Sequence, residues 1–229
     1  MLKLPKIVIF DLDNTLYDYD SANYFGKLAL IDYLSENLSK EPSDISKELE
    51  RSRIRVKETL GKTASSHSRL LYIRDFLTRN EIFTHATFAL ECEQVYWRAF
   101  LDKSILFEGV MDFISLLRLN RVKIVLITDF TTDIQLRKLS WFNLEKSFDL
   151  VITSEEAGGD KITGKPENFL ENFISVSDRE VWAIGDMDYD HIFVSESTFF
   201  KKVQSKEFKN TRERRYEFSS FLDLLSKLN

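Results

Sequence analysis

The chain begins with a short apolar run that ends in two acidic residues. Residues 7–10 read Ile-Val-Ile-Phe, and Asp11 and Asp13 follow with one leucine between them. A continuous apolar run bounded in this way is typical of a strand buried on both faces of a parallel sheet. Because side chains alternate along a strand, we expect Asp11 and Asp13 to point the same way, at the edge where open α/β sheets bind ligands. The alternative is a polar turn in which Asp13 or Thr15 caps a following helix.

The next part of the chain, from about residue 20 to residue 102, has helical periodicity and no convincing strand pattern. The predicted helices cover residues 21–38, 45–60, 65–78 and 84–101. Ser43 or Asp44 is expected to cap the second of them. Roughly 80 residues between two strands is too long for a crossover helix. We therefore predict an inserted all-helical cap domain at residues 18–104, and a core domain made of residues 1–17 and 105–229.

Strands and helices alternate in the remainder of the chain. The predicted strands cover residues 122–127, 150–153, 181–184 and 199–203. The predicted helices cover residues 110–119, 132–141, 166–174 and 219–228, with a weak helix before the last strand. This alternation predicts an α/β fold with a doubly wound parallel sheet, of the Rossmann-like kind, into which the helical domain is inserted.

Composition narrows the classes of function. The balance of 32 basic and 37 acidic residues gives a formal net charge of -5, which argues against a general nucleic-acid binder. No apolar run approaches the roughly 20 residues needed to span a bilayer. The first strand follows the initial residues directly, so we expect a cytoplasmic protein without a signal peptide or a membrane partner. The single cysteine, Cys92, cannot form an internal disulfide.

Polar residues follow three of the predicted strands at their carboxyl ends. Asp11 and Asp13 follow the first strand, Thr128 and Asp129 the second, and Asp186 the fourth. Parallel strands bring these ends to one edge of the sheet, where residues distant in sequence can meet. A phosphate and a hard divalent cation could bind there together. The site would offer two or three carboxylates, a hydroxyl, and a lysine from the loop at 158–165. Mg²⁺ prefers oxygen ligands, which fits Asp11 and Asp186.

Several stretches carry a resemblance to a known family. The motif Asp-Leu-Asp-Asn-Thr at residues 11–15 ends the first strand, and the apolar strand at 123–128 ends in Thr. Phe-Glu-Gly-Val at 107–110 precedes the strand at 123–128, and Gly-Asp-Met-Asp-Tyr-Asp follows it at 185–190. Between the strand at 123–128 and the motif at 185–190, residues 135–139, 148–149 and 153–156 resemble the segments that precede the family's lysine. In this order and spacing the chain resembles the haloacid dehalogenase-like hydrolases, in the branch with a helical cap inserted after the first motif.

The resemblance implies roles for the two acids of the first motif. Asp11 would be the nucleophile that forms an aspartyl-phosphate, and its other oxygen would bind Mg²⁺. Asp13 would be the general acid and then the general base, and its backbone carbonyl would also bind the metal. An acid at position 13 separates the chain from the dehalogenase branch, so the resemblance favours phosphatase chemistry over cleavage of a carbon–halogen bond.

The later motifs complete the implied site. Thr128, together with Asp129, would bind phosphoryl oxygens. Asp186 would complete the metal ligands, and Asp190 would order a metal-bound water without binding the metal itself. Residues 191–198 depart from the family's usual small residues and glycine, which leaves Asp188 as an alternative to Asp190.

Two lysines compete for the family's lysine position. Lys165 stands before Pro166, which resembles the family's Lys-Pro pair, and proline suits the first turn of a helix. Lys161 stands nearer to the Ser-Glu-Glu segment. We predict that Lys165 binds the phosphate, with Lys161 as the alternative.

The predicted function is that of a Mg²⁺-dependent phosphatase that hydrolyses a small phosphorylated metabolite. Two alternatives stay open at this point. A sugar phosphomutase of the same family would return the phosphoryl group to its substrate. A non-catalytic, haloacid dehalogenase-like binding or scaffold protein would explain the unusual residues after Asp190.

Overall fold

The computed structural model describes residues 2–82, 86–174, 180–191, 197–204 and 208–228. The chain divides into two compact units, Met1–Asp18 with Ile105–Asn229, and Tyr19–Ser104. We call the first the core unit and the second the helical insert. The predicted domains, 1–17 with 105–229 and 18–104, differ from these units only in the assignment of residue 18.

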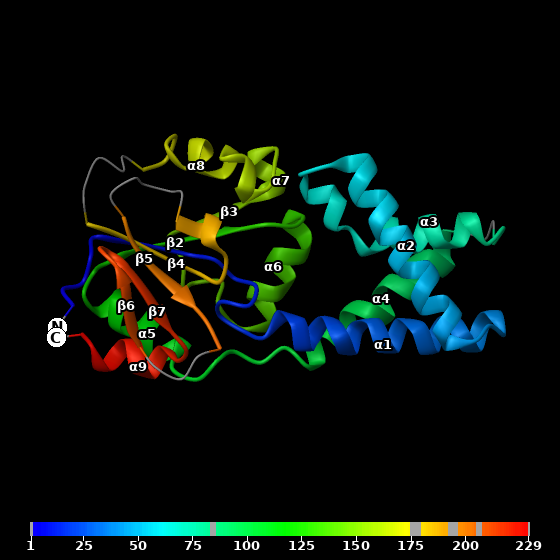
Figure 1. The fold of residues 1–229 in the computed structure, drawn as a ribbon, viewed down its shortest axis with the longest axis horizontal. Helices are drawn as coiled ribbons and strands as arrows, with labels where there is room; N and C mark the ends of the chain where they lie inside the picture. The colour runs from blue at the N-terminus through cyan, green and yellow to red at the C-terminus, as the bar shows by residue number, and fades with distance from the viewer. Residues whose placement is uncertain (1, 83–85, 175–179, 192–196, 205–207, 229) are drawn as a thin grey trace. The chain divides into compact units, whose positions relative to one another are not determined.

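The core unit is built on one seven-stranded sheet with the strand order β3-β2-β1-β4-β5-β7-β6 (Figure 1). The strands are β1 Ile7–Phe10, β2 Lys123–Thr128, β3 Leu150–Thr153, β4 Val181–Gly185, β5 Thr198–Lys202, β6 Lys209–Arg212 and β7 Arg215–Phe218. Neighbouring strands are parallel except for the antiparallel pair β6–β7. Phe10 pairs with Leu126 of β2 and with Ile184 of β4. The residues that follow these three strands therefore lie beside one another, as the sequence predicted.

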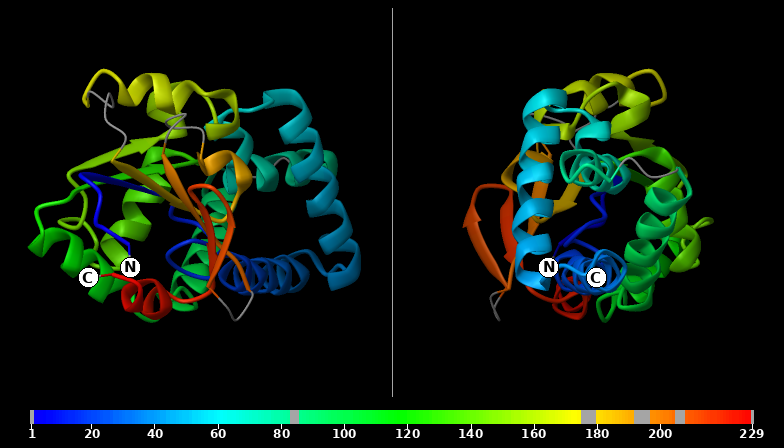
Figure 2. Two further views of the ribbon diagram at one scale, coloured as in Figure 1. Left: turned by 60° about the vertical axis from the view of Figure 1, so that its left-hand side comes forward. Right: turned by 90° about the vertical axis from the view of Figure 1, so that its right-hand side faces the viewer.

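Helices cover both faces of this sheet. They are α5 Val110–Leu119, α6 Thr132–Trp141, α7 Ser154–Ala157, α8 Lys165–Leu170 and α9 Phe221–Ser226, with 3-10 turns η2 Lys161–Thr163 and η3 Asp188–His191. Helices α7 and α8 lie on one face, and α5 and α9 on the other (Figures 1 and 2). Ile9 belongs to the apolar cluster on the α8 side, whereas Phe10 packs edge-on against Phe113 of α5. Burial on both faces explains why the strands read as unbroken apolar runs.

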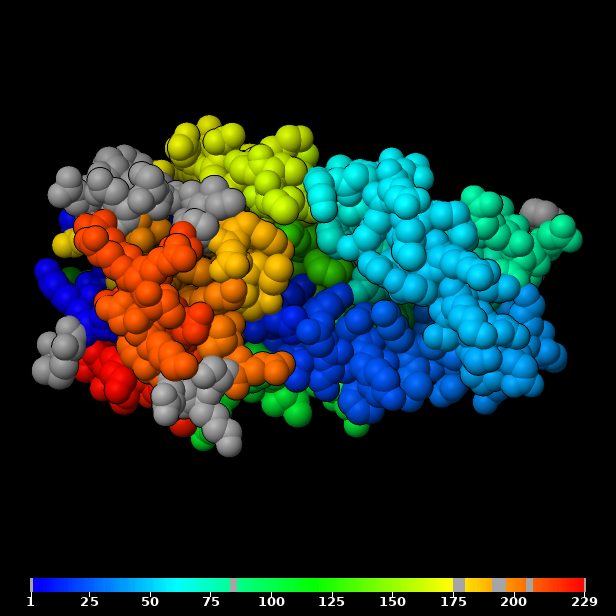
Figure 3. All heavy atoms as spheres, in the orientation of Figure 1, coloured from blue at the N-terminus to red at the C-terminus, as the bar shows by residue number. Residues whose placement is uncertain are grey.

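The hairpin β6–β7 is an addition that the sequence did not predict. Residues 209–212 read Lys-Asn-Thr-Arg, and all four are exposed. The hairpin lies at the surface of the core unit, in orange to red in Figure 3. An edge strand exposed on both faces needs no apolar alternation, so periodicity gives no sign of it.

The helical insert contains α1 Tyr19–Leu38, α2 Pro42–Leu60, the 3-10 turn η1 Ala64–His67, α3 Arg69–Arg79 and α4 Ala86–Asp102. Helices α1 and α4 pack closely because Gly26 has no side chain. A Cβ there would lie 2.9 Å from Cε2 of Tyr96 and 3.1 Å from its carbonyl oxygen. Trp97 and Phe100 are buried with Tyr96, so these aromatic residues form the core of the insert.

Two local predictions in the insert were wrong. Helix α2 begins after Glu41 with Pro42 in its first turn, and neither Ser43 nor Asp44 precedes it as a cap. The helix predicted at 65–78 is instead a 3-10 turn followed by α3, because Ser68 starts a new helix there. Its Oγ accepts a hydrogen bond from the Leu71 amide at 3.3 Å. Among the described residues, no helix combines the length and the apolar character that crossing a membrane requires.

Candidate active site

The first motif places Asp11 at the carboxyl end of β1. Its amide donates to the carbonyl oxygen of Ile184 at 2.9 Å, so the ladder with β4 extends one residue beyond the strand. Asn14 has a φ of 59°, and this left-handed residue turns the chain back. Thr15 can then donate its hydroxyl to Oδ2 of Asp11 at 3.0 Å. Thr15 thus holds Asp11 and does not cap a helix, since α1 begins only at Tyr19.

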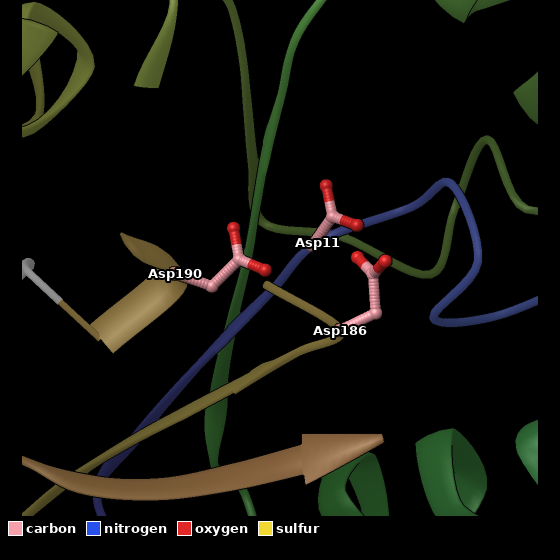
Figure 4. A group of neighbouring side chains, drawn as sticks. All are labelled: Asp11, Asp186 and Asp190. Atoms are coloured by element: carbon pink, nitrogen blue, oxygen red, sulfur yellow. The ribbon is translucent and has the colours of Figure 1, made fainter. Parts of the chain in front are cut away.

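Asp11 faces two other carboxylates. One oxygen from each of Asp11, Asp186 and Asp190 lies within 4.8 Å of the others, and the side chains converge from β1, the end of β4 and η3 (Figure 4). Gly185 makes this possible, because a Cβ there would overlap with the Asp190 carboxylate. The Met187 amide donates to Oδ2 of Asp190 at 2.9 Å and fixes that side chain.

The structure brings Lys161, and not Lys165, to this cluster. Nζ of Lys161 lies 2.6 Å from Oδ1 of Asp11 and 2.6 Å from Oδ1 of Asp190, and the side chain is buried. Lys165 is exposed and donates to the carbonyl oxygen of Gly158 at 2.7 Å. Its placement corrects the prediction of Lys165 as the phosphate-binding lysine.

The physical reason lies in the loop between η2 and α8. Gly164 has a φ of 74° and ends η2, so α8 starts at Lys165 and turns that side chain outward. One turn earlier, Oδ1 of Asp129 accepts the Lys161 amide at 2.8 Å and holds Lys161 toward β1. Pro166 does start a helix, but the lysine before it is not the one that reaches the carboxylates.

The two candidate acids of the last motif, Asp188 and Asp190, lie in different places. Asp190 was predicted to act on a metal-bound water and not on the metal, but its carboxylate belongs to the same cluster as those of Asp11 and Asp186. Asp188 is exposed, and its Oδ1 forms an ion pair with Nζ of Lys201 at 2.9 Å. The structure therefore places Asp190 at the site and Asp188 on the surface.

Asp13 has partners that the sequence did not reveal. Nζ of Lys138, from α6, lies 2.8 Å and 2.9 Å from its two carboxylate oxygens, and the Tyr17 hydroxyl donates to Oδ1 at 2.5 Å. Lys138 is fully buried. A lysine buried on a helix needs an acidic partner. The sequence signal for such a partner was the position of Lys138 on the same face of α6 as the apolar residues Ile134 and Leu139.

Thr128 is held by a second buried residue of α6. Nε2 of Gln135 donates to Oγ1 of Thr128 at 2.7 Å and to the carbonyl oxygen of Asp129 at 2.5 Å. Thr128 and Gln135 are both buried. Asp129 was predicted to bind substrate. Its carboxylate instead accepts a hydrogen bond from the Lys161 amide, and its carbonyl oxygen accepts one from Nε2 of Gln135.

The electrostatics of the cluster suit a divalent cation. Burial raises the pKa of Asp11 well above its usual range, and the carboxylates of Asp190 and Asp186 raise it further against the effect of Lys161. Burial and then Asp190 raise the pKa of Asp186 to about 6. For Lys161, burial lowers the pKa, but Asp11 and Asp190 outweigh it and the pKa is raised. Three converging carboxylates that repel one another fit the oxygen ligands that Mg²⁺ prefers.

Comparison with known proteins identifies the family of the chain. The family model for haloacid dehalogenase-like hydrolases matches residues 5–191, and the chain belongs to this family. The chain is 36% identical over 159 residues to the ribulose-1,5-bisphosphate 5-phosphatase of Halopiger xanaduensis. That match covers 69% of this chain and 66% of the relative, so it spans slightly less than two thirds of the relative's length.

Solved structures share the fold. The 2-haloacid dehalogenase from Pseudomonas syringae pv. Tomato DC3000 has a TM-score of 0.69 and 20% identity, with 97% of each chain covered. The HAD-hydrolase YfnB from Bacillus subtilis, solved bound to magnesium, has a TM-score of 0.64 and 18% identity, with 99% of each chain covered. At these identities the likeness establishes the Rossmann-like α/β fold of the family.

Proposed function

We propose that this protein is a Mg²⁺-dependent phosphatase that hydrolyses the phosphate monoester of a small metabolite through an aspartyl-phosphate. The observation that carries the proposal is the buried Lys161, which bridges Asp11 and Asp190 beside Asp186 at the carboxyl ends of β1 and β4. An ammonium, three carboxylates and the Thr128 hydroxyl are the groups that phosphoryl transfer requires. The phosphatase name of the curated relative supports the same chemistry.

In the first step, a carboxylate oxygen of Asp11 attacks phosphorus. The new bond joins this oxygen to phosphorus, and the bond between phosphorus and the ester oxygen breaks. Asp13, two residues on, gives a proton to the departing alkoxide. Lys161 neutralises charge on the nucleophile and on the phosphoryl group, and Thr128 donates a hydrogen bond to a phosphoryl oxygen.

In the second step, water attacks the phosphorus of the aspartyl-phosphate. Asp13 takes a proton from this water, and the bond between phosphorus and Asp11 breaks. Inorganic phosphate leaves, and the Asp11 carboxylate is restored. Mg²⁺ held by Asp11, Asp186 and Asp190, with the backbone carbonyl of Asp13, would supply further neutralisation of the phosphoryl charge.

A further lysine near the site, Lys202, supports a proposal for the class of substrate. The relative's name specifies a sugar with two phosphates. Lys201 pairs with Gly185 across β4 and β5, so Lys202 lies beside Asp186. Its Nζ lies 4.3 Å from the centre of the Phe107 ring. Burial lowers the pKa of Lys202, and the opposing effect of Asp18 and Asp186 only partly offsets it. We propose that Lys202 binds the phosphate of a sugar bisphosphate that is not transferred.

A matched pair of variants tests this substrate class. Lys202→Met should lower kcat/KM for ribulose 1,5-bisphosphate by about tenfold, the loss expected for a charged hydrogen bond. It should leave kcat/KM for ribulose 5-phosphate unchanged. Lys201→Met, which removes only the surface pair with Asp188, is the control and should affect neither substrate. Equal losses on both substrates for Lys202→Met would exclude a role in binding a second phosphate.

The proposed reaction itself is tested by phosphate release. The purified protein should release phosphate from a panel of phosphorylated sugars and from p-nitrophenyl phosphate when Mg²⁺ is present, and EDTA should stop the release. Asp11→Asn keeps the shape of the side chain but removes the nucleophile, so turnover should be lost while the unfolding midpoint stays close to that of the wild type. Turnover that survives this change would refute the assignment.

A further inference from the structure

The side-chain amide of Gln135 is buried directly against Thr128. Gln135 lies on α6 and is fully buried. Its amide nitrogen and oxygen can be told apart by their partners. The Asp129 carbonyl oxygen, 2.5 Å away, can only accept a hydrogen bond, so the atom facing it must be the NH₂ group.

This orientation decides what the Thr128 hydroxyl can do. One amide hydrogen of Gln135 goes to the Asp129 carbonyl, and the other goes to Oγ1 of Thr128 at 2.7 Å. Oγ1 therefore accepts on this side and must send its own hydrogen elsewhere. Among the described residues, the other acceptor near it is the Asp129 carbonyl at 3.4 Å, close to the limit of a hydrogen bond. The hydroxyl hydrogen is left available to a ligand.

The same orientation leaves Gln135 imperfectly satisfied. Its Oε1 is buried and has no hydrogen-bond partner among the described residues. A buried acceptor without a partner costs stability. The two hydrogen bonds from the NH₂ group to Asp129 and Thr128 therefore set the orientation of the amide, although its oxygen is left without a partner among the described residues.

We infer that Gln135 is a positioning residue that fixes the Thr128 hydroxyl as a donor to the transferred phosphoryl group. The inference rests on the proposed phosphatase function. Gln135 itself does not touch the substrate; it acts by occupying the lone pair of Oγ1 that faces away from the phosphate. Three residues along the same buried face, Lys138 holds Asp13, so α6 supports two groups of the site.

A double-mutant cycle tests whether Gln135 acts through this hydroxyl. Gln135→Met keeps the length of the side chain but donates nothing, and the freed hydroxyl can turn toward Asp129. We expect kcat/KM for p-nitrophenyl phosphate to fall about tenfold and the inhibition constant of inorganic phosphate to rise by a similar factor. In the Thr128→Val background there is no hydroxyl to position, so the same change at Gln135 should alter kcat/KM by less than about twofold.

Gln135→Glu gives a second variant of nearly identical shape. Its carboxylate can only accept, so it should draw the Thr128 hydrogen away from the phosphate and lower kcat/KM by about a hundredfold, more than Gln135→Met does. Only part of this effect should disappear in the Thr128→Val background, because the carboxylate also faces the Asp129 carbonyl oxygen, which can only accept. Leu139→Ala, at a buried apolar position of α6, is the control for general damage to the helix. It should lower the unfolding midpoint without changing phosphate inhibition.

The outcomes separate this inference from the proposed function. Equal losses for Gln135→Met in both backgrounds, or no loss in either, would overturn the positioning role while Asp11-dependent turnover still stands. Turnover that Asp11→Asn leaves intact would overturn the proposed function and, with it, the inference.

Discussion

Replacing Lys161 by Met is expected to destabilise the protein far more than replacing Lys165. Lys161 contributes the ammonium that lies 2.6 Å from both Asp11 and Asp190, and its side chain is 4% exposed. Without it, two buried carboxylates face each other and Asp186, and no other lysine or arginine among the described residues forms an ion pair with them. Lys165 is exposed, and among the described residues its ammonium donates to the backbone carbonyl oxygen of Gly158.

The size of the effect follows from burial. Removing one partner of a buried ion pair costs about 3–5 kcal/mol, because the other charge stays in a poorly solvated place. Asp11 and Asp190 are 6% and 1% exposed, so water can screen them little. Lys165→Met is a change at an exposed position and should shift the free energy of unfolding by no more than about 0.5 kcal/mol.

The assay is urea unfolding of the wild type and both variants near neutral pH, first in EDTA and then with Mg²⁺. With an unchanged m-value, the loss appears as a lower midpoint for Lys161→Met. Mg²⁺ should recover part of this loss, since binding at 100 times Kd adds about 2.7 kcal/mol. Equal midpoints for the two variants, or a larger loss for Lys165→Met, would refute the placement of Lys161.

Three further predictions concern other parts of the structure. Lys138→Met should slow hydrolysis of alkyl phosphates roughly 10²-fold more than that of p-nitrophenyl phosphate, whose leaving group needs no proton from Asp13. Equal losses on both would contradict this. Gly26→Ala should lower the free energy of unfolding by about 1–3 kcal/mol, because the added methyl meets Tyr96; an unchanged melting temperature would contradict the packing. Burial and Asp190 raise the pKa of Asp186 from 3.8 to about 6, so the folded state holds this proton more tightly than the unfolded state does. Unfolding in EDTA should show stability falling as pH rises through this window, and Asp186→Asn should reduce that slope, whereas an unchanged slope would speak against the shift.

The sequence was sufficient for the parts of the fold that depend on apolar periodicity. The runs at 7–10 and 123–128 had to be interior strands, and the long helical stretch after the first strand had to be an insert. The same reasoning missed the β6–β7 hairpin because its polar residues face solvent. It also missed the break at Ser68, because a single capping serine changes the phase of a helix without changing its composition.

The site was predictable where a residue follows a strand directly, as Asp11 and Asp186 do. It was not predictable where a loop decides which side chain points inward. Local sequence favoured Lys165 because Pro166 follows it, but the left-handed Gly164 turns that lysine to the surface and leaves Lys161 in the site. Lysines on helices are usually exposed, and although Lys138 shares the apolar face of α6, the structure is needed to show that its ammonium pairs with Asp13.

The most direct test of the account is to trap the bond between Asp11 and phosphorus. The enzyme would be quenched during turnover of p-nitrophenyl phosphate with Mg²⁺ and reduced with borohydride, which converts an aspartyl-phosphate to homoserine. Mass spectrometry of the peptide that contains residue 11 should show homoserine at that position, and the signal should be absent without substrate. Homoserine at another aspartate, with position 11 unmodified, would contradict the central claim.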